Sequence, residues 1–217
     1  MTPREAIRIL EDRMNASVLG QEHVVSRLIM GLLADGNILI EGLPGLAKTR
    51  AVRAMADVID GKFSRIQFTP DLLPLDVLGT QLLYDEDGKK TFHFHQGPIF
   101  GNIILADEIN RAPAKIQSAM LEAMEERQVT VAGETHKLPD LFIVMATQNP
   151  LEQVGTFPLS EAQKDRFFMH VKIDYAKMEA EFQMIRMIQE ERFTQSEPKE
   201  KISQEMIFDA RREVAQI

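Results

Sequence analysis

The sequence Gly42-Leu43-Pro44-Gly45-Leu46-Ala47-Lys48-Thr49 decides how the rest of the chain is interpreted. It follows the apolar run 38–40 and precedes a helical pattern over residues 50–59. A strand, a tight glycine-bearing loop and a helix in this order are typical of a phosphate-binding loop, because free backbone N–H groups and the positive end of the helix dipole attract the anion. The pattern predicts that Lys48 contacts the β- and γ-phosphates of a nucleotide and that Thr49 binds its magnesium ion.

One position departs from the usual form of this loop. Glycine normally precedes the lysine, whereas this chain has Ala47. A methyl group is compatible with a helical backbone there, because only a positive φ requires glycine. The alternative interpretation is a turn whose lysine has no role with phosphate.

The composition is that of a globular protein, with 44% apolar and 27% charged residues among 217. The absence of cysteine excludes disulfides and cysteine zinc sites, and a cytoplasmic protein without membrane span or signal peptide is expected. The net charge of −8 disfavours a broad nucleic-acid surface.

Short apolar runs alternate with helical patterns along the chain, which predicts an α/β fold with a parallel sheet covered by helices on both faces. We expect core strands at residues 37–41, 64–68, 103–106, 141–146 and 168–173. Alternation and turn residues also predict β-hairpins over residues 81–95, around Asp87-Gly88, and over residues 128–138. His93 and His95 have a spacing suited to a metal, but without a third ligand a solvated hairpin is favoured.

Beyond Asp174 only helical patterns follow. Two apolar stripes recur at helical spacing, at Met178, Phe182, Ile185 and Ile188 and at Met206, Ile207, Ala210, Val214 and Ile217. These helices cannot cover both stripes by themselves, so we expect the stripes to stay partly uncovered.

Ligands of a parallel α/β sheet bind at the carboxyl ends of the strands. Asp107-Glu108 ends one predicted strand, and Asn149 follows another. The Asp107 carboxylate suits a magnesium shell, Glu108 a general base that polarises the attacking water, and Asn149 a group that orients this water. A solvated strand end is the alternative for the two acids, and turn chemistry before Pro150 is the alternative for Asn149.

Arg166 is the remaining candidate, just before the last predicted strand. Phosphoryl transfer is helped by positive charge on the phosphate oxygens, often from an arginine of a neighbouring subunit. Taken alone, a salt-bridged surface arginine is the simpler interpretation.

Four segments, at residues 42–49, 106–112, 145–150 and 159–167, together resemble the MoxR family of AAA+ ATPases. In that family alanine before the loop lysine is normal. The resemblance extends over nearly all of residues 1–217 and implies an αβα ATPase core with a parallel five-stranded sheet and two β-hairpin insertions. This core would span residues 1–173, and residues 174–217 would begin a C-terminal helical lid.

The resemblance also implies the site. ATP or ADP with Mg²⁺ would be the bound group, Thr49 and Asp107 would hold the metal, and Lys48, Glu108, the sensor Asn149 and the finger Arg166, acting in trans, would be catalytic. Nucleotide contacts are expected from Val18, Gly20, Gln21, Gly42, Pro44, Gly45, Leu46, Ala47, Lys48, Thr49 and Arg50, with Val18 to Gln21 at the adenine.

The same resemblance implies a ring, expected to be a hexamer, that remodels or activates a client protein, often one with a von Willebrand factor A domain. The family's lid carries a second sensor arginine in a part that these 217 residues do not contain, so slow hydrolysis is expected of the chain as given. One alternative is a helicase-like or magnesium-chelatase-like motor, for which the first hairpin tip, Asp85 to Lys90, has mixed charge. Another is a nucleotide-binding switch without turnover, which Glu108 disfavours.

Overall fold

The structure is a computed structural model that describes residues 1–43, 48–86, 89–150, 155–174, 178–191 and 200–216. Its central sheet consists of five strands: β1 (Ile38–Gly42), β2 (Phe63–Gln67), β5 (Ile103–Asp107), β8 (Ile143–Gln148) and β9 (Met169–Ile173). All neighbouring pairs are parallel, in the order β2-β5-β8-β1-β9. The predicted fold class is therefore confirmed.

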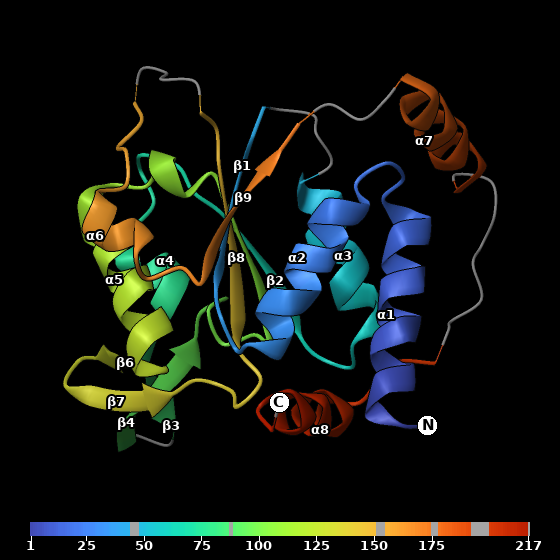
Figure 1. Ribbon diagram of the computed structural model, residues 1–217. Coiled ribbons are helices and arrows are strands. Elements are labelled where there is room, and N and C mark those ends of the chain that lie inside the picture. Colours follow the sequence, from blue (N-terminus) through green and yellow to red (C-terminus); the bar gives the residue numbers. More distant parts are fainter. Residues whose placement is uncertain (44–47, 87–88, 151–154, 175–177, 192–199, 217) are drawn as a thin grey trace.

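The sheet separates two apolar cores, because successive side chains of a strand point to opposite faces. On β8, Ile143 and Met145 enter one core, whereas Val144 and Ala146 enter the other. The first face is covered by α1 (Pro3–Ser17), α2 (Glu22–Leu33) and α3 (Lys48–Val58). On the second face lie α4 (Pro74–Leu78), α5 (Ala114–Glu126) and α6 (Glu161–Lys164), which completes a three-layer sandwich (Figure 1).

Two antiparallel hairpins are added to this sandwich, as predicted. They pair β3 (Gly79–Glu86) with β4 (Lys89–Gln96) and β6 (Gln128–Val131) with β7 (Glu134–Lys137). The rings of Phe94 and His136 stack with centroids 3.7 Å apart, so the hairpins lie side by side (Figure 1). Asp87 and Gly88, at the predicted turn, lie outside the described residues.

The last helix, α8 (Gln204–Val214), packs against α1 and α2 (Figure 1). Ile207 and Ala210 are buried, and Ile207 belongs to the same core as α1 and α2. Part of this apolar stripe is therefore covered by α1 and α2, and part of it stays exposed, as expected. Its periodicity shows that one face is apolar, but the covering elements are a hundred residues or more away in sequence. Val214 is exposed, and Ile217 lies outside the described residues.

Asp35 fixes α8 to the amino-terminal edge of the sheet. Its carboxylate lies 2.8 Å from the Arg211 guanidinium and 3.0 Å from that of Arg127, which ends α5. Arg211 Nε also donates to the Leu32 carbonyl at 2.9 Å. Burial lowers the pKa of Arg211, and Asp35 acts in the opposite direction.

Helix α7 (Met178–Glu191) stands apart from the sheet in Figure 1, and Phe182 is exposed. The side chains of Met178, Ile185 and Ile188 lie outside the described residues. The boundary between a core at 1–173 and a lid from 174 stays a prediction. In the described part of the chain, no helix is both long and apolar enough to cross a membrane.

Candidate functional site

The carboxyl ends of three neighbouring strands carry the predicted polar residues. β1 ends at Gly42, β5 at Asp107 and β8 at Gln148, and these strands are adjacent in the sheet. Helix α3 begins at Lys48, after the loop that follows β1. Lys48, Asp107 and Glu108 therefore lie together at the carboxyl ends of the central strands. The loop residues Pro44, Gly45, Leu46 and Ala47 lie outside the described residues.

Lys48 bridges the ends of two strands. Its Nζ donates to the Gly42 carbonyl at 2.6 Å and to the Gln148 carbonyl at 3.3 Å. Burial lowers the pKa of Lys48, while the carboxylates of Asp107 and Glu108 oppose this shift. The ammonium is thus held among oxygens, at the place where the sequence predicts phosphate.

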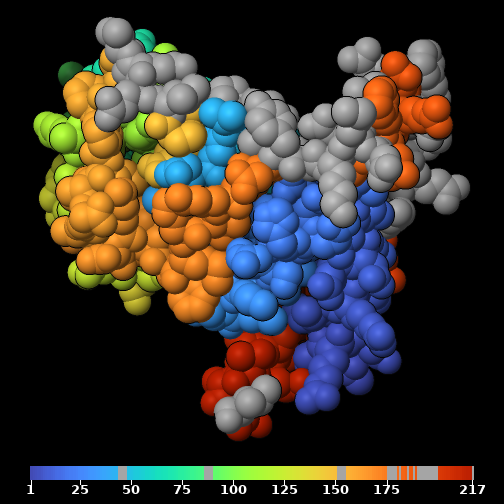
Figure 2. Space-filling model, turned by 45° about the horizontal axis from the view of Figure 1, so that its top comes forward, coloured from blue at the N-terminus to red at the C-terminus, as the bar shows by residue number. Residues whose placement is uncertain are grey.

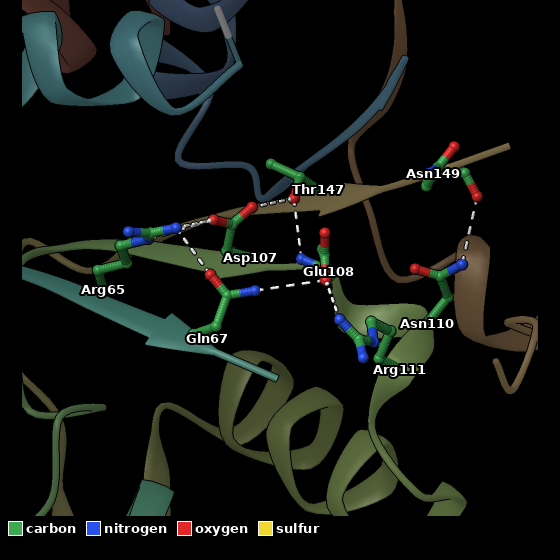
Figure 3. Close-up of polar contacts among 8 residues, drawn as sticks. All are labelled: Arg65, Gln67, Asp107, Glu108, Asn110, Arg111, Thr147 and Asn149. Carbon is green, nitrogen blue, oxygen red and sulfur yellow. Dashed lines mark hydrogen bonds and ion pairs between the residues drawn. The ribbon is translucent and has the colours of Figure 1, made fainter. Parts of the chain in front are cut away.

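Asp107 is buried and its carboxylate is held from two sides. Arg65 of β2 donates to Oδ2 through Nε at 3.1 Å and through a terminal nitrogen at 2.6 Å. The fully buried Thr147 hydroxyl donates to Oδ1 at 2.6 Å (Figure 3). These three hydrogen bonds to the carboxylate fix its orientation.

Glu108 is the first residue beyond β5 and has a left-handed backbone, with φ 59° and ψ 49°. Its N–H donates to Thr147 Oγ1 at 2.9 Å, so one hydroxyl contacts both acids (Figure 3). The Glu108 carboxylate is half-buried and accepts from Arg111 at 2.9 Å and from Gln67 Nε2 at 3.4 Å. These contacts hold the carboxylate at the sheet edge, within reach of solvent.

Asn149 follows β8, and its backbone carbonyl accepts a 3.3 Å hydrogen bond from Asn110 Nδ2 (Figure 3). Asn110 is buried in the 3₁₀ turn Ile109–Arg111 that follows Glu108. The ends of β5 and β8 are thus joined beyond the sheet as well as within it.

Arg166 lies outside this group of contacts. It follows α6, is exposed, and forms an ion pair with Glu125 of α5 at 2.7 Å. The segment that carries α6 forms a large part of one outer face (orange in Figure 2). Arg166 lines an open groove of about 570 Å³ there, together with Ser118, Leu121, Glu122, Glu125, Glu126, Gln128, Ala162 and Gln163.

The segment predicted to contact adenine adjoins the start of α3. Arg50 Nε donates to the Ser17 carbonyl at 2.7 Å, next to the buried Val18. Gly20 has a positive φ of 74°, and Gln21 Nε2 donates to the Asp174 carbonyl at 2.9 Å. The structure therefore brings the segment from Val18 to Gln21 close to the helix that the phosphate loop precedes.

Thr49 and Asp107 offer oxygen ligands, the type that Mg²⁺ prefers. A carboxylate has about four acceptor positions, and Asp107 already uses three for Arg65 and Thr147. The described residues contain no cluster of three or more acidic or imidazole ligands. The residues therefore fit an ion that keeps most of its own waters, as magnesium does with nucleotides.

Sequence reasoning missed Arg65, Gln67, Thr147 and Arg111. Arg65 and Gln67 alternate with the buried Ile66 at the end of β2, and long polar side chains near a strand's carboxyl end are a usable signal. Thr147 gives no comparable signal, because its partners depend on β8 lying beside β5.

Comparison with known families identifies one match. Residues 37–169 match the model of the family described as "ATPase family associated with various cellular activities (AAA)". The matched segment includes four of the five strands completely, both hairpins and the residues of Figure 3.

Individual relatives agree with this match. The chain is 51% identical over 168 residues to "Chaperone MoxR1" of Mycobacterium tuberculosis, covering 77% of this chain and 44% of that protein. It is 33% identical over 172 residues to "Protein MoxR" of Paracoccus denitrificans, covering 77% and 50%. A crystal structure from Cytophaga hutchinsonii, described as a candidate ATPase, superposes with a TM-score of 0.87 at 44% identity, covering 99% of this chain and 64% of the other. The chain thus spans about half the length of these curated relatives.

Proposed function

The chain belongs to the MoxR family of AAA+ ATPases, and from this premise we propose that it binds ATP with Mg²⁺ at the carboxyl edge of its sheet and hydrolyses it. One observation supports this proposal above the others. A lysine ammonium, a fixed buried carboxylate and a solvent-accessible carboxylate converge at the ends of β1, β5 and β8.

Each residue suits one task in this reaction. Lys48 exchanges its two carbonyl partners for phosphate oxygens, because an ammonium gains more from an anion than from neutral acceptors. Thr49 and Asp107 would hold a hydrated magnesium ion, whose positive charge would neutralise charge on the phosphates. Glu108 accepts the proton of the attacking water, and Asn149 orients that water.

Nucleotide contacts are proposed for Val18, Gly20, Gln21, Gly42, Pro44, Gly45, Leu46, Ala47, Lys48, Thr49 and Arg50. The Arg50–Ser17 contact supports this set, because it joins the start of α3 to the segment proposed for adenine. For the four proposed residues between Gly42 and Lys48, the proposal rests on the sequence motif alone.

Arg166 is proposed to act on the site of a neighbouring subunit. It is exposed on an outer face and has no contact with Lys48, Asp107 or Glu108 among the interactions described above. An arginine supplied from another subunit must be available on the surface, and one ion pair between exposed groups is weak enough to exchange.

We further propose that hydrolysis in a ring of six subunits remodels or activates a protein client with a von Willebrand factor A domain. The relative named "Chaperone MoxR1" supports a chaperone-like role. On the first hairpin, Leu83 and Phe92 are cross-strand partners and are 52% and 68% exposed. Such an apolar pair favours a protein contact over the phosphates that a helicase-like motor would bind.

Two substitutions test the site in the full-length protein. Lys48→Ala should remove most nucleotide affinity, whereas Glu108→Gln should retain affinity and block hydrolysis. Titration with a fluorescent ATP analogue measures the first effect, and phosphate release measures the second. Lys115→Ala and Glu11→Gln, at exposed positions, are matched controls. Equal turnover of Glu108→Gln and the unmodified protein would refute the role of Glu108.

A further inference from the structure

A buried glutamine connects the segment after Glu108 with the helix before Arg166. Gln117 lies on α5 and is only 2% exposed. Its Nε2 donates to the Phe157 carbonyl at 2.7 Å and to the Ile109 carbonyl at 3.3 Å. Its Oε1 accepts from Gln163 Nε2 of α6 at 3.4 Å. One side-chain amide thus contacts three segments that the chain separates.

On one side, these contacts lead to the candidate site. Ile109 and Asn110 follow Glu108 directly, and the Phe157 N–H donates to the Asn110 carbonyl at 2.6 Å. Asn110 in turn donates to the Asn149 carbonyl (Figure 3). Gln117 is therefore bonded to the 3₁₀ turn that joins the ends of β5 and β8.

On the other side, the contacts lead to Arg166. Gln163 lies in the four-residue helix α6, and the Arg166 N–H donates to the Gln163 carbonyl at 3.4 Å. A helix this short is marginal on its own, so its position depends on tertiary contacts. The Gln163–Gln117 hydrogen bond and the Arg166–Glu125 ion pair both attach this segment to α5.

An amide at this place has no advantage for packing alone. An apolar side chain would fill the same volume without the cost of burying polar atoms, so a fully paired buried amide indicates a requirement for one specific arrangement. The Phe157 carbonyl comes from an irregular segment and the Ile109 carbonyl from a single 3₁₀ turn, so no β-ladder fixes the spacing between them.

We propose that Gln117 is a positioning residue that holds α6, and with it Arg166, at a fixed place relative to the turn after Glu108. This inference rests on the proposed action of Arg166 in trans. A displacement of about 1 Å at a reacting group can lower a rate about a hundredfold. Gln117 contacts neither nucleotide nor water in this proposal, and its effect on turnover passes through Arg166.

The test uses two substitutions in the full-length ring protein. Gln117→Leu keeps the volume and removes all three hydrogen bonds. Gln163→Glu is milder: a glutamate still accepts from the Ser160 N–H, as Gln163 does at 2.9 Å, but no longer donates to Gln117. Met124→Ala, at a buried position on the same helix, is the control for a general loss of stability. If Gln117→Leu does not fold, Gln163→Glu supplies the result.

We expect kcat to fall about tenfold to a hundredfold for Gln117→Leu, with ATP affinity changed by less than about twofold. Adding Gln117→Leu to Arg166→Ala should lower kcat no further, because both changes remove the same contribution. In mixed rings, the defect should follow the subunit that donates Arg166. The control should reduce the melting temperature while keeping kcat.

Two results would overturn the inference in distinguishable ways. In the first, Arg166→Ala slows turnover, but adding Gln117→Leu lowers kcat further, or Gln163→Glu keeps the kcat of the unmodified protein. Gln117 then does not act through Arg166, and the proposed function stands. If Arg166→Ala itself has unmodified turnover, the proposed role of Arg166 fails and the inference fails with it.

Discussion

Replacement of Thr147 by valine tests whether one buried hydroxyl holds both acids of the candidate site. Valine keeps the shape but removes the 2.6 Å bond to Asp107 and the 2.9 Å bond from the Glu108 N–H. A hydrogen bond to a charged group contributes about 1.5–3 kcal/mol, and an unpaired buried N–H costs about 1–3 kcal/mol. Because Glu108 is half-buried, water replaces part of the second loss. We therefore expect the free energy of unfolding to fall by about 2–4 kcal/mol.

Urea-induced unfolding measures this loss as a lower midpoint at unchanged slope. Steady-state phosphate release should show a lower kcat with little change in the ATP concentration at half-maximal rate, because Lys48 is untouched. Thr147→Ser is the matched control, since it keeps the hydroxyl and loses one buried methyl group, worth about 1 kcal/mol. The reasoning is refuted if the valine variant stays within about 0.5 kcal/mol of the unmodified protein, or if serine is as damaging as valine.

Four further predictions follow from the same structure. Mixing Arg166→Ala with Glu108→Gln subunits should restore some phosphate release, because a trans arginine and a cis base come from different chains; no recovery in confirmed mixed rings would contradict this. Ile207→Ala should lower the free energy of unfolding, measured in urea, by about 2–4 kcal/mol, whereas Val214→Ala should lower it by less than about 0.5 kcal/mol. Equal losses would contradict the packing of α8. Nucleotide affinity should weaken as pH rises through the lowered pKa of Lys48, because only the ammonium attracts phosphate; a titration that is flat until the ordinary lysine range would show that burial has no such effect. Duplex DNA at physiological salt should leave the ATPase rate unchanged, and salt-dependent stimulation would favour a helicase-like motor.

The central sheet was predictable because its strands are short, apolar and bounded by motifs. Buried strands such as Ile103–Asp107 are distinct from amphipathic helices, and the rule that ligands lie at the carboxyl ends of parallel strands grouped Lys48 with Asp107 in advance. Likewise, the Asp87-Gly88 dipeptide between two alternating segments predicted the first hairpin from local sequence.

The contacts that hold the acids were beyond prediction, since they depend on which strands become neighbours. Arg65 reaches Asp107 only because β2 pairs with β5, and Thr147 does so only because β8 pairs with β5. Strand order is set by how the whole chain packs. The packing of Ile207 against α1 and α2 was beyond prediction for the same reason, because periodicity identifies an apolar face without identifying its partner.

The left-handed backbone of Glu108 means that the residue that would be most stable at this position differs from the residue that activity requires. A residue other than glycine with φ near 59° costs about 1 kcal/mol or more, and glycine would avoid this cost. The contacts of the Glu108 side chain with Arg111 and Gln67 offset little of this conformational cost, because they are partly exposed to water. A library of variants at position 108 selected only for resistance to heat should therefore accumulate glycine, and each such variant would lack the proposed base. Thermal stability and turnover at this residue would then rank the same substitutions in opposite orders.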